Sequence, residues 1–225
     1  MSGGTIEVGW ATAALADVPP DDGWLGPREL GVLERLRFPR RRETWRLGRF
    51  AVKRLLGDVE VLPSPEGPPR AFRGDSPLPL SLSLSHRDGV AVCVAAPGDV
   101  ALGCDVERIE PRSAAFLADF LTESERAAAA VSPELLANLM WSAKESALKA
   151  LRVGLARDTR ELEVSIGEAD APWRELVVDD RAGGRSLPGV WRRAGDHVLT
   201  IVSWPARPVP IGAAGRLGPR SGSSG

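Results

Sequence analysis

The chain has few cysteines, no long apolar run and almost no net charge, and each shortage excludes a class of protein. The two cysteines, Cys93 and Cys104, support neither a disulfide scaffold nor a zinc site, so we expect two buried thiols. No stretch of about 20 apolar residues is present, which argues against a membrane span. A net charge of −1 argues against broad nucleic-acid binding.

Residues 1–10 have neither a basic start nor a continuous apolar run, so we expect no secretory leader. We therefore expect a cytoplasmic protein. With 225 residues, 43% of them hydrophobic and 26% charged, the chain can bury the core of one large domain or two small ones.

Lysine is scarce although cations are not. The chain has 29 lysines and arginines, but lysine occurs only at Lys53, Lys144 and Lys149. Where arginine is the default cation, two lysines this close together indicate a specific need. A lysine is a compact point charge that contacts phosphate and shifts its pKa when desolvated.

The first motif that carries chemistry is the stretch Gly103-Cys104-Asp105-Val106-Glu107. The alternation over residues 100–107 predicts a strand with Leu102, Cys104 and Val106 on one face and Asp105 and Glu107 on the other. Residues two apart on a strand lie about 7 Å apart, so both carboxylates can reach one hard cation.

The second motif, Trp141-Ser142-Ala143-Lys144-Glu145 continuing to Lys149, follows a helical apolar spacing that starts after Ser132 and Pro133. Trp141, Glu145 and Lys149 then share one face. The alternative is a solvated face with an ordinary ion pair between Glu145 and Lys149.

Residues 35–54 form a concentrated basic segment with Glu43 as its one acid. A helix over residues 41–56, ended by Gly57, would carry Arg42, Arg46, Arg49 and Lys53 as a cationic stripe. Such a stripe suits a small, highly phosphorylated ligand, and the alternative is a solvated basic face.

Strands are expected in two groups, before and after the helix. Residues 63–79, rich in proline and glycine, are expected to be a loop. Strands over 80–85, 90–96 and 100–107 would then follow as three antiparallel neighbours, with a turn at 86–89. Four further strands are expected at 162–166, 176–179, 190–192 and 198–204, with His197 in a structural role.

In combination, the two motifs resemble the paired signature of the 4′-phosphopantetheinyl transferases, and the length resembles the longer, pseudodimeric type that primes surfactin synthetase. The basic segment, the Gly67-Pro68-Pro69-Arg70 turn, the Leu84-Ser85-His86 strand end and Gly154-Leu155 agree with it. The resemblance runs from about Glu34 to about Val164. The family usually has a second serine after the histidine, where this chain has Arg87.

The resemblance implies an α+β fold made of two similar lobes, with the ligand cleft between them. We expect an N-terminal lobe over residues 1–100, a C-terminal lobe over 101–215 and a disordered tail over 216–225. Pattern alone predicts only the α+β class. Because both lobes lie in one chain, we expect a monomer.

The resemblance also implies site residues. Asp105, Glu107 and Glu145 would hold Mg²⁺, with Mn²⁺ as an alternative. The coenzyme A phosphates would be bound by the following residues: Arg42, Arg46, Arg49, Arg70, Ser85, His86 and Lys149. His86 could otherwise be a residue capping its own hairpin. The catalytic residues would be Glu145, Lys149 and Lys144, with Glu145 as the base, directly or through a metal-bound water, and Lys144 as its rival.

The activity implied is transfer of 4′-phosphopantetheine from coenzyme A to a serine of an acyl or peptidyl carrier protein, releasing 3′,5′-ADP. Residues 116–121 are either the apolar patch that docks this carrier or a core-facing helix. Two alternatives stay open: a Mg²⁺-dependent phosphohydrolase and a non-catalytic sensor of coenzyme A or a nucleotide.

Overall fold

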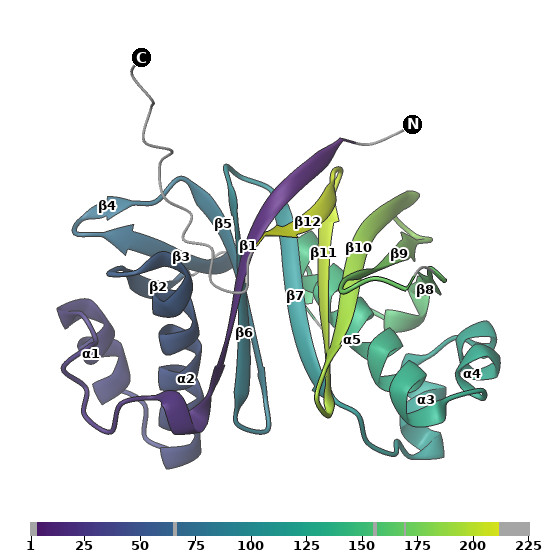
Figure 1. The fold of residues 1–225 in the computed structure, drawn as a ribbon, viewed down its shortest axis with the longest axis horizontal. Coiled ribbons are helices and arrows are strands. Elements are labelled where there is room, and N and C mark those ends of the chain that lie inside the picture. Colours follow the sequence, from purple (N-terminus) through teal and green to yellow (C-terminus); the bar gives the residue numbers. More distant parts are fainter. Residues whose placement is uncertain (1–3, 65–66, 155–156, 169, 212–225) are drawn as a thin grey trace.

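The computed structural model describes residues 4–64, 67–154, 157–168 and 170–211 and has a mixed α+β fold, which confirms the expected fold class (Figure 1). The helices are α1 (Pro27–Glu34), α2 (Pro39–Leu56), α3 (Ala114–Phe120), α4 (Glu123–Ala129) and α5 (Pro133–Leu151). The strands are β1 (Thr5–Ala14), β2 (Glu60–Ser64), β3 (Gly67–Arg73), β4 (Ser76–Pro77), β5 (Leu80–Arg87), β6 (Val90–Pro97), β7 (Ala101–Arg108), β8 (Leu162–Ile166), β9 (Arg174–Asp180), β10 (Arg185–Ala194), β11 (His197–Trp204) and β12 (Arg207–Ile211).

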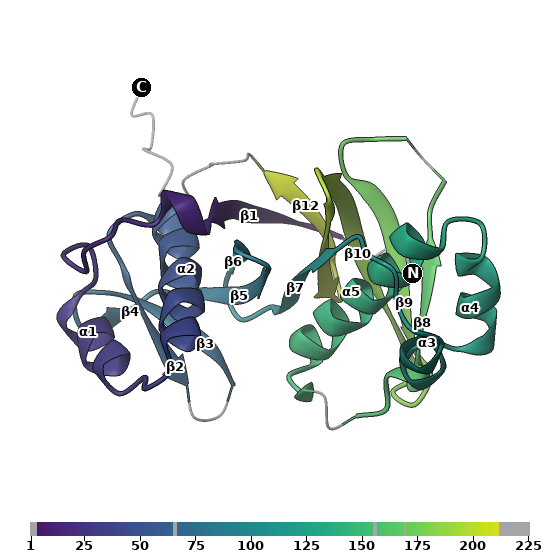
Figure 2. The same cartoon turned by 90° about the horizontal axis from the view of Figure 1, so that it is seen from below.

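The first sheet has the strand order β12-β1-β6-β5 and is covered by α2. α2 begins at Pro39, two residues before the expected start at Arg41, and Gly57, at a φ of 78°, ends it as predicted. Its apolar residues Leu47, Val52 and Leu55 pack on small side chains of β1 and β6. Figures 1 and 2 show α2 and α5 on opposite sides of the strands.

The expectation of a loop over residues 63–79 is wrong, because this segment contributes to a small sheet of order β2-β3-β4. Proline argues against a strand because it lacks the N–H that pairs strands. Here the paired register jumps from Leu62, which faces Arg70, to Ser64, which faces Gly67. Pro68 and Pro69 fall in this irregular step, so the ladder between β2 and β3 loses no donor at a paired position, whereas Pro77 pairs with Phe72 at the end of the short strand β4.

The second sheet has the order β7-β11-β10-β9-β8 and is covered by α5. The four expected later strands are confirmed with wider bounds, except that β8 keeps the predicted ones. The expectation of three antiparallel neighbours holds for β5 and β6 only. β7 pairs with β11 instead, and it lies beside β5 through side chains, since the backbone N–H of Cys104 donates to Ser83 Oγ at 3.0 Å.

The two sheets share an apolar layer between them. It joins Val8, Val92 and Val94 of the first sheet to Cys104 and Ile201 of the second. The alternation predicted for residues 100–107 is therefore confirmed, because Leu102, Cys104 and Val106 all lie in this layer. Both cysteines are free and fully buried, as expected, and burial raises the pKa of the Cys104 thiol to about 12.

The chain returns to the first sheet at its last described strand. β12 runs parallel to β1, with Thr5 facing Arg207 and Gly9 facing Ile211. By sequence β12 falls in the range 101–215, and by pairing it lies in the sheet of β1, β5 and β6. The tail expected at 216–225 lies outside the described residues. None of the described helices is both long enough and apolar enough to span a bilayer.

Candidate active site

The two sequence motifs meet because α5 crosses β7 at very close range. A Cβ atom added at Gly103 would collide with the backbone oxygen of Ser146, so only glycine fits at this position. The hydroxyls of Ser142 and Ser146 lie 2.9 and 2.7 Å from the Thr200 hydroxyl on β11. These buried hydrogen bonds fix the helix against the sheet.

A pocket of about 380 Å³ opens where α5, β7 and the end of β5 come together. It is lined by the following residues: Leu84, Ser85, His86, Arg87, Asp105, Val106, Glu107, Trp141, Glu145 and Lys149. All three carboxylates of the two motifs therefore lie in one pocket. We call it the carboxylate pocket.

Asp105 is paired with a lysine and a hydroxyl and is only 4% exposed. Its Oδ1 accepts from Lys149 Nζ at 2.8 Å and from Ser85 Oγ at 2.6 Å. Its Oδ2 is buried and has no partner. Although burial opposes the charged form of Lys149, the charge of Asp105 raises the pKa of this lysine above its ordinary value.

Glu107 has both oxygens engaged by protein donors. Trp141 Nε1 donates to Oε1 at 3.0 Å, and Arg112 Nη2 donates to Oε2 at 2.7 Å. Burial and the neighbouring Asp105 nevertheless raise the pKa of Glu107. The sequence analysis missed Arg112, which lies in the irregular segment after β7 and also donates to Asn138 at 2.5 Å.

Glu145 is the most perturbed acid of the pocket. Its Oε1 is buried without a hydrogen-bond partner. Burial, followed by the charge of Asp105, raises the pKa of Glu145 to about 7, while Lys149 opposes the shift. A carboxyl group that titrates near neutral pH is suited to exchanging a proton.

The carboxylates of the pocket suit a hard divalent cation, although Asp105 already pairs with Lys149 and Glu107 with Arg112. Among the described residues, no three His, Cys, Asp or Glu side chains are arranged as a ready metal cluster. Asp105 Oδ2 and Glu145 Oε1 are nevertheless buried carboxylate oxygens without partners. Such oxygens are the preferred ligands of Mg²⁺, and their desolvation is offset when a cation binds.

Ser85, His86 and Arg87 line the pocket from the end of β5. His86 pairs with Ala91 inside the strand ladder, so the turn is shorter than the expected 86–89 and consists of Asp88 and Gly89 at φ values of 45° and 76°. Desolvation and the charge of Lys149 lower the pKa of the exposed His86. Arg87 contacts Glu110 at 2.7 Å instead of pointing freely into the pocket.

Lys144 is not part of the carboxylate pocket. It is fully buried and lies 2.6 Å from Glu125 of α4, and it donates to the backbone oxygen of Phe120 at 2.9 Å. Desolvation lowers the pKa of Lys144, and Glu125 opposes this shift. Glu125 also forms a capping box with Thr122, so Lys144 closes a buried polar cluster.

The basic stripe of α2 is likewise not brought to the carboxylates. Arg42 donates to the backbone oxygen of Leu33, and Arg46 Nε lies 2.8 Å from Asp22. Of the remaining two members, Lys53 lies 2.9 Å from Glu29, and Arg49 stacks 4.1 Å over Trp45 of the same helix. Burial lowers the pKa of Arg49 to about 10. The stripe thus holds α1 and the segment before it.

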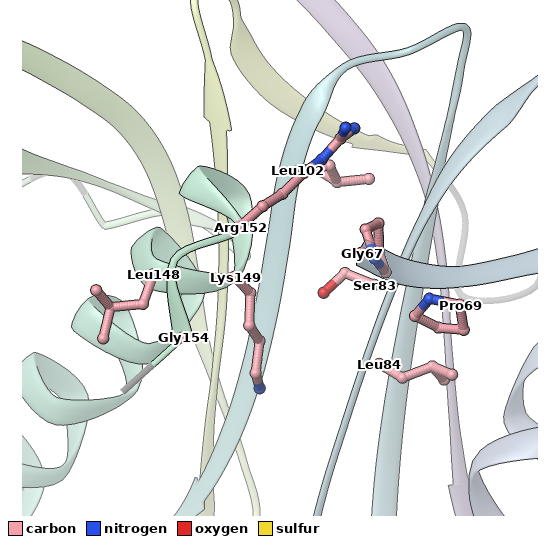
Figure 3. A pocket seen from close by; sticks show the side chains of 10 residues that line it. Gly67, Pro69, Ser83, Leu84, Leu102, Leu148, Lys149, Arg152 and Gly154 are labelled. Atoms are coloured by element: carbon pink, nitrogen blue, oxygen red, sulfur yellow. The ribbon is translucent and has the colours of Figure 1, made fainter. Parts of the chain in front are cut away.

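Two further pockets continue the carboxylate pocket. The first, of about 340 Å³, has mostly apolar walls and lies between the end of α5 and the β3 and β5 strands (Figure 3). Lys149 and Leu84 line both this pocket and the carboxylate pocket. The second, of about 480 Å³, contains Arg70 and shares Arg152 with the first. Arg152 forms an ion pair with Asp99.

The segment 116–121 packs against the protein, in agreement with the core-facing alternative, and its docking of a carrier stays a prediction. Leu117 packs against the core and Leu121 is fully buried within it. Phe116 and Phe120 instead lie against Trp141, with ring centroids 5.4 and 4.6 Å from it. The two phenyl rings therefore support the tryptophan that binds Glu107.

His197 pairs with Asp196 at 2.8 Å, which agrees with a structural role.

Comparison with known proteins gives one finding and one absence. No curated protein gives a significant match to the chain. The family model ACPS, described as the 4′-phosphopantetheinyl transferase superfamily, matches residues 101–202. This range contains both motifs and all three carboxylates, so the part of the chain from β7 to β11 is similar to 4′-phosphopantetheinyl transferases.

Proposed function

We propose that the protein transfers 4′-phosphopantetheine from coenzyme A to a serine of an acyl or peptidyl carrier protein. The observation that carries the proposal is the convergence of Asp105, Glu107 and Glu145 with Lys149 in one pocket. The family match over residues 101–202 supports it. The longer pseudodimeric subtype is part of the proposal, and residues 4–100 lie outside the match.

The donors of the carboxylate pocket would bind the pyrophosphate of coenzyme A. Lys149 supplies a charge and the exposed His86 a second donor at the end of β5. The apolar pocket beyond Lys149 suits the less polar pantetheine arm, and Arg70 offers a cation farther along. Arg42, Arg46 and Arg49 contribute less, since other parts of the protein engage them.

Magnesium would be held by Asp105 and Glu145 through their unpartnered oxygens, with Glu107 beside them. When bound, it would neutralise phosphate oxygens and stabilise the departing 3′,5′-ADP. Arg112 and Trp141 fix the orientation of Glu107 through hydrogen bonds to its two oxygens. This arrangement limits the freedom of Glu107.

The chemical step needs one proton acceptor. The serine oxygen of the carrier forms a bond to the β-phosphorus as the bond from that phosphorus to the bridging oxygen breaks, and this oxygen leaves on 3′,5′-ADP. Glu145 would take the serine proton, since a carboxylate beside a bound cation is ionised at neutral pH and can accept a proton through its second oxygen. Lys144 is unsuited to this role because it is fully buried beside Glu125.

The test is intact-mass spectrometry of an apo carrier protein incubated with coenzyme A, Mg²⁺ and this protein. We expect the carrier to gain one phosphopantetheine group. Asp105→Asn and Glu145→Gln should abolish the gain, and Arg160→Gln, at an exposed ion pair, should retain it. A series of apo carriers that stays unmodified while coenzyme A binds would overturn the transferase proposal. Cleavage of coenzyme A without an acceptor would instead indicate a phosphohydrolase.

A further inference from the structure

A second polar pocket lies at the opposite end of α5 from Lys149. It has a volume of about 380 Å³ and lies between the first turn of the helix and one end of the second sheet. The residues Leu135, Ala171, Pro172, Arg174, Trp191, Arg192 and Arg193 line it. Three arginines and no acidic residue are among them, so the lining has a strong positive bias.

The strand register places the key residues on one face. Arg174 of β9 lies directly opposite Trp191 of β10, and Arg193 follows two residues later on the same side. The guanidinium of Arg174 stacks over the Trp191 ring, with its central carbon 5.1 Å from the ring centroid. Leu135 of α5 lines the same pocket.

Trp191 carries a buried donor that has no acceptor. The residue is only 3% exposed, and its indole Nε1 forms no hydrogen bond. An indole N–H can only donate, and leaving such a group unpaired away from water is unfavourable. The Arg192 side chain points to the other face of the strand, where its guanidinium stacks over Trp10 and Trp173, so it does not contribute to this donor set.

The start of α5 adds to the positive character of the pocket. Ser132 stands at the N-cap, but its side chain accepts no backbone hydrogen bond. The first N–H groups of a helix lack intrahelical partners, and the helix dipole favours an anion at this end. The first turn of α5 also carries an acid, Glu134, so the positive character of the pocket comes mainly from its arginines.

Two contacts compete for the arginines, and both lie at the surface. Arg174 lies 2.5 Å from Asp170, whose side chain is 90% exposed, and Arg193 Nε donates to the backbone oxygen of Gly195 at 2.9 Å. An ion pair of such exposure contributes little to stability. A ligand with a higher charge density can replace Asp170 at the Arg174 guanidinium.

We infer that this pocket binds a small phosphate-bearing ligand through Arg174, Arg193 and the Trp191 indole N–H. The pocket volume admits inorganic phosphate or a small phosphate monoester. The site is separate from the carboxylate pocket, because Leu135 and Glu145 are about 15 Å apart along α5. It does not depend on the proposed transferase activity.

The tryptophan side chains allow a test by NMR of the full chain labelled with ¹⁵N. Each of the seven tryptophans has its own indole N–H resonance, and Trp191→Phe and Trp141→Phe assign two of them. Inorganic phosphate, ribose 5-phosphate and sodium chloride are titrated separately at constant ionic strength. We expect the Trp191 resonance to shift saturably with a phosphate compound and not with chloride. Trp141 reports on the carboxylate pocket in the same spectra.

Matched variants complete the test. Arg174→Gln and Arg193→Gln should each weaken the binding seen at Trp191 by about tenfold. Asp170→Asn should strengthen it, and this exposed position leaves the fold intact. A response to ribose 5-phosphate alone would identify a monoester as the ligand. A Trp191 resonance that does not move, that moves equally with chloride, or whose response is unchanged in Asp170→Asn would overturn the inference.

Discussion

Lys149 on α5 lies 2.8 Å from Asp105 on β7 and also donates to the backbone oxygen of Cys104 at 3.0 Å. One ammonium group thus joins the two sequence motifs and balances a carboxylate that is 4% exposed. A metal cation bound at Asp105 would offset part of the carboxylate charge that Lys149 otherwise offsets alone. The stability of the site should therefore respond to lysine removal and to magnesium together.

Lys149→Met should destabilise the metal-free protein by roughly 1–3 kcal/mol, because Asp105 then stays buried with Ser85 as its one partner. Added Mg²⁺ should raise the unfolding temperature more in this variant than in the wild type. Thermal unfolding with and without Mg²⁺ measures both effects. The matched control is Lys53→Met, which removes the cation 2.9 Å from buried Glu29 outside the pocket. An equal response to Mg²⁺ in both variants would contradict a metal site at Asp105.

The raised pKa of Glu145 predicts how stability changes with pH. In the folded protein this pKa is about 7, above its ordinary value of 4.5, so the folded state holds the proton more tightly than the unfolded chain. The contribution of Glu145 to stability should therefore fall as pH rises from about 4.5 to about 7. Glu145→Gln removes this loss.

We compare the free energy of unfolding of Glu145→Gln with that of the wild type, both without metal. As pH rises from 5 to 8, this difference should change by roughly 1–3 kcal/mol in favour of the variant, after allowance for partial solvation of the side chain. Denaturant unfolding at both pH values measures the difference. The same substitution should abolish carrier modification, because the proton acceptor is lost. A constant stability difference across this pH range would show that Glu145 titrates at its ordinary pKa.

Trp141→Phe should slow catalysis without unfolding the protein. The phenyl ring keeps the packing against Phe116 and Phe120, while the hydrogen bond to Glu107 Oε1 is lost. We expect kcat to fall about tenfold with a small change in unfolding temperature. Trp24→Phe is the control, since its indole donates to the backbone oxygen of Asp21 away from the pocket. Equal kcat in both variants would remove Trp141 from the positioning of Glu107.

The carboxylate site was predictable because it rests on periodicity. Strand alternation put Asp105 and Glu107 on one face, and helical spacing put Trp141, Glu145 and Lys149 on another, and the structure brings these faces together. The role of Gly103 needed the structure, since no pattern reveals how closely a helix crosses a strand. Arg112 lies in an irregular segment, where sequence spacing does not predict direction.

Other expectations failed because tertiary pairing decides them. An alternating strand can pair with any neighbour, so the sequence did not reveal that β7 joins β11 instead of β6. The basic face of α2 was visible as a stripe, but its carbonyl and carboxylate partners, such as Asp22 for Arg46, come from distant segments. Charge patterning identifies a cationic face and does not say what covers it.

Arg46 and His86 should separate structural from ligand-binding donors. Arg46 donates to the backbone oxygen of Asp21 at 2.8 Å, so Arg46→Gln should lower stability by about 1–2 kcal/mol and leave the Kd of coenzyme A nearly unchanged. His86 is exposed in the carboxylate pocket, so His86→Ala should raise this Kd with little change in unfolding temperature. Calorimetric titration and thermal unfolding measure both variants. A raised Kd in Arg46→Gln together with an unchanged Kd in His86→Ala would instead indicate that the α2 stripe contacts the phosphates.

Lys144 provides the sharpest distinction between a base and a structural residue. Lys144→Met leaves Glu125 as a buried charge without its cation, although the Val164 and Thr122 N–H groups still donate to it. We expect a loss of about 3–5 kcal/mol in the free energy of unfolding. At temperatures below its lowered unfolding temperature, the variant should keep the wild-type Mg²⁺ affinity and the wild-type pH profile of activity, because Asp105 and Glu145 are unchanged. Lys144→Met with Glu125→Gln should recover part of the stability, since the neutral amide needs no cation. A single variant that stays folded but loses carrier modification would instead make Lys144 the proton acceptor.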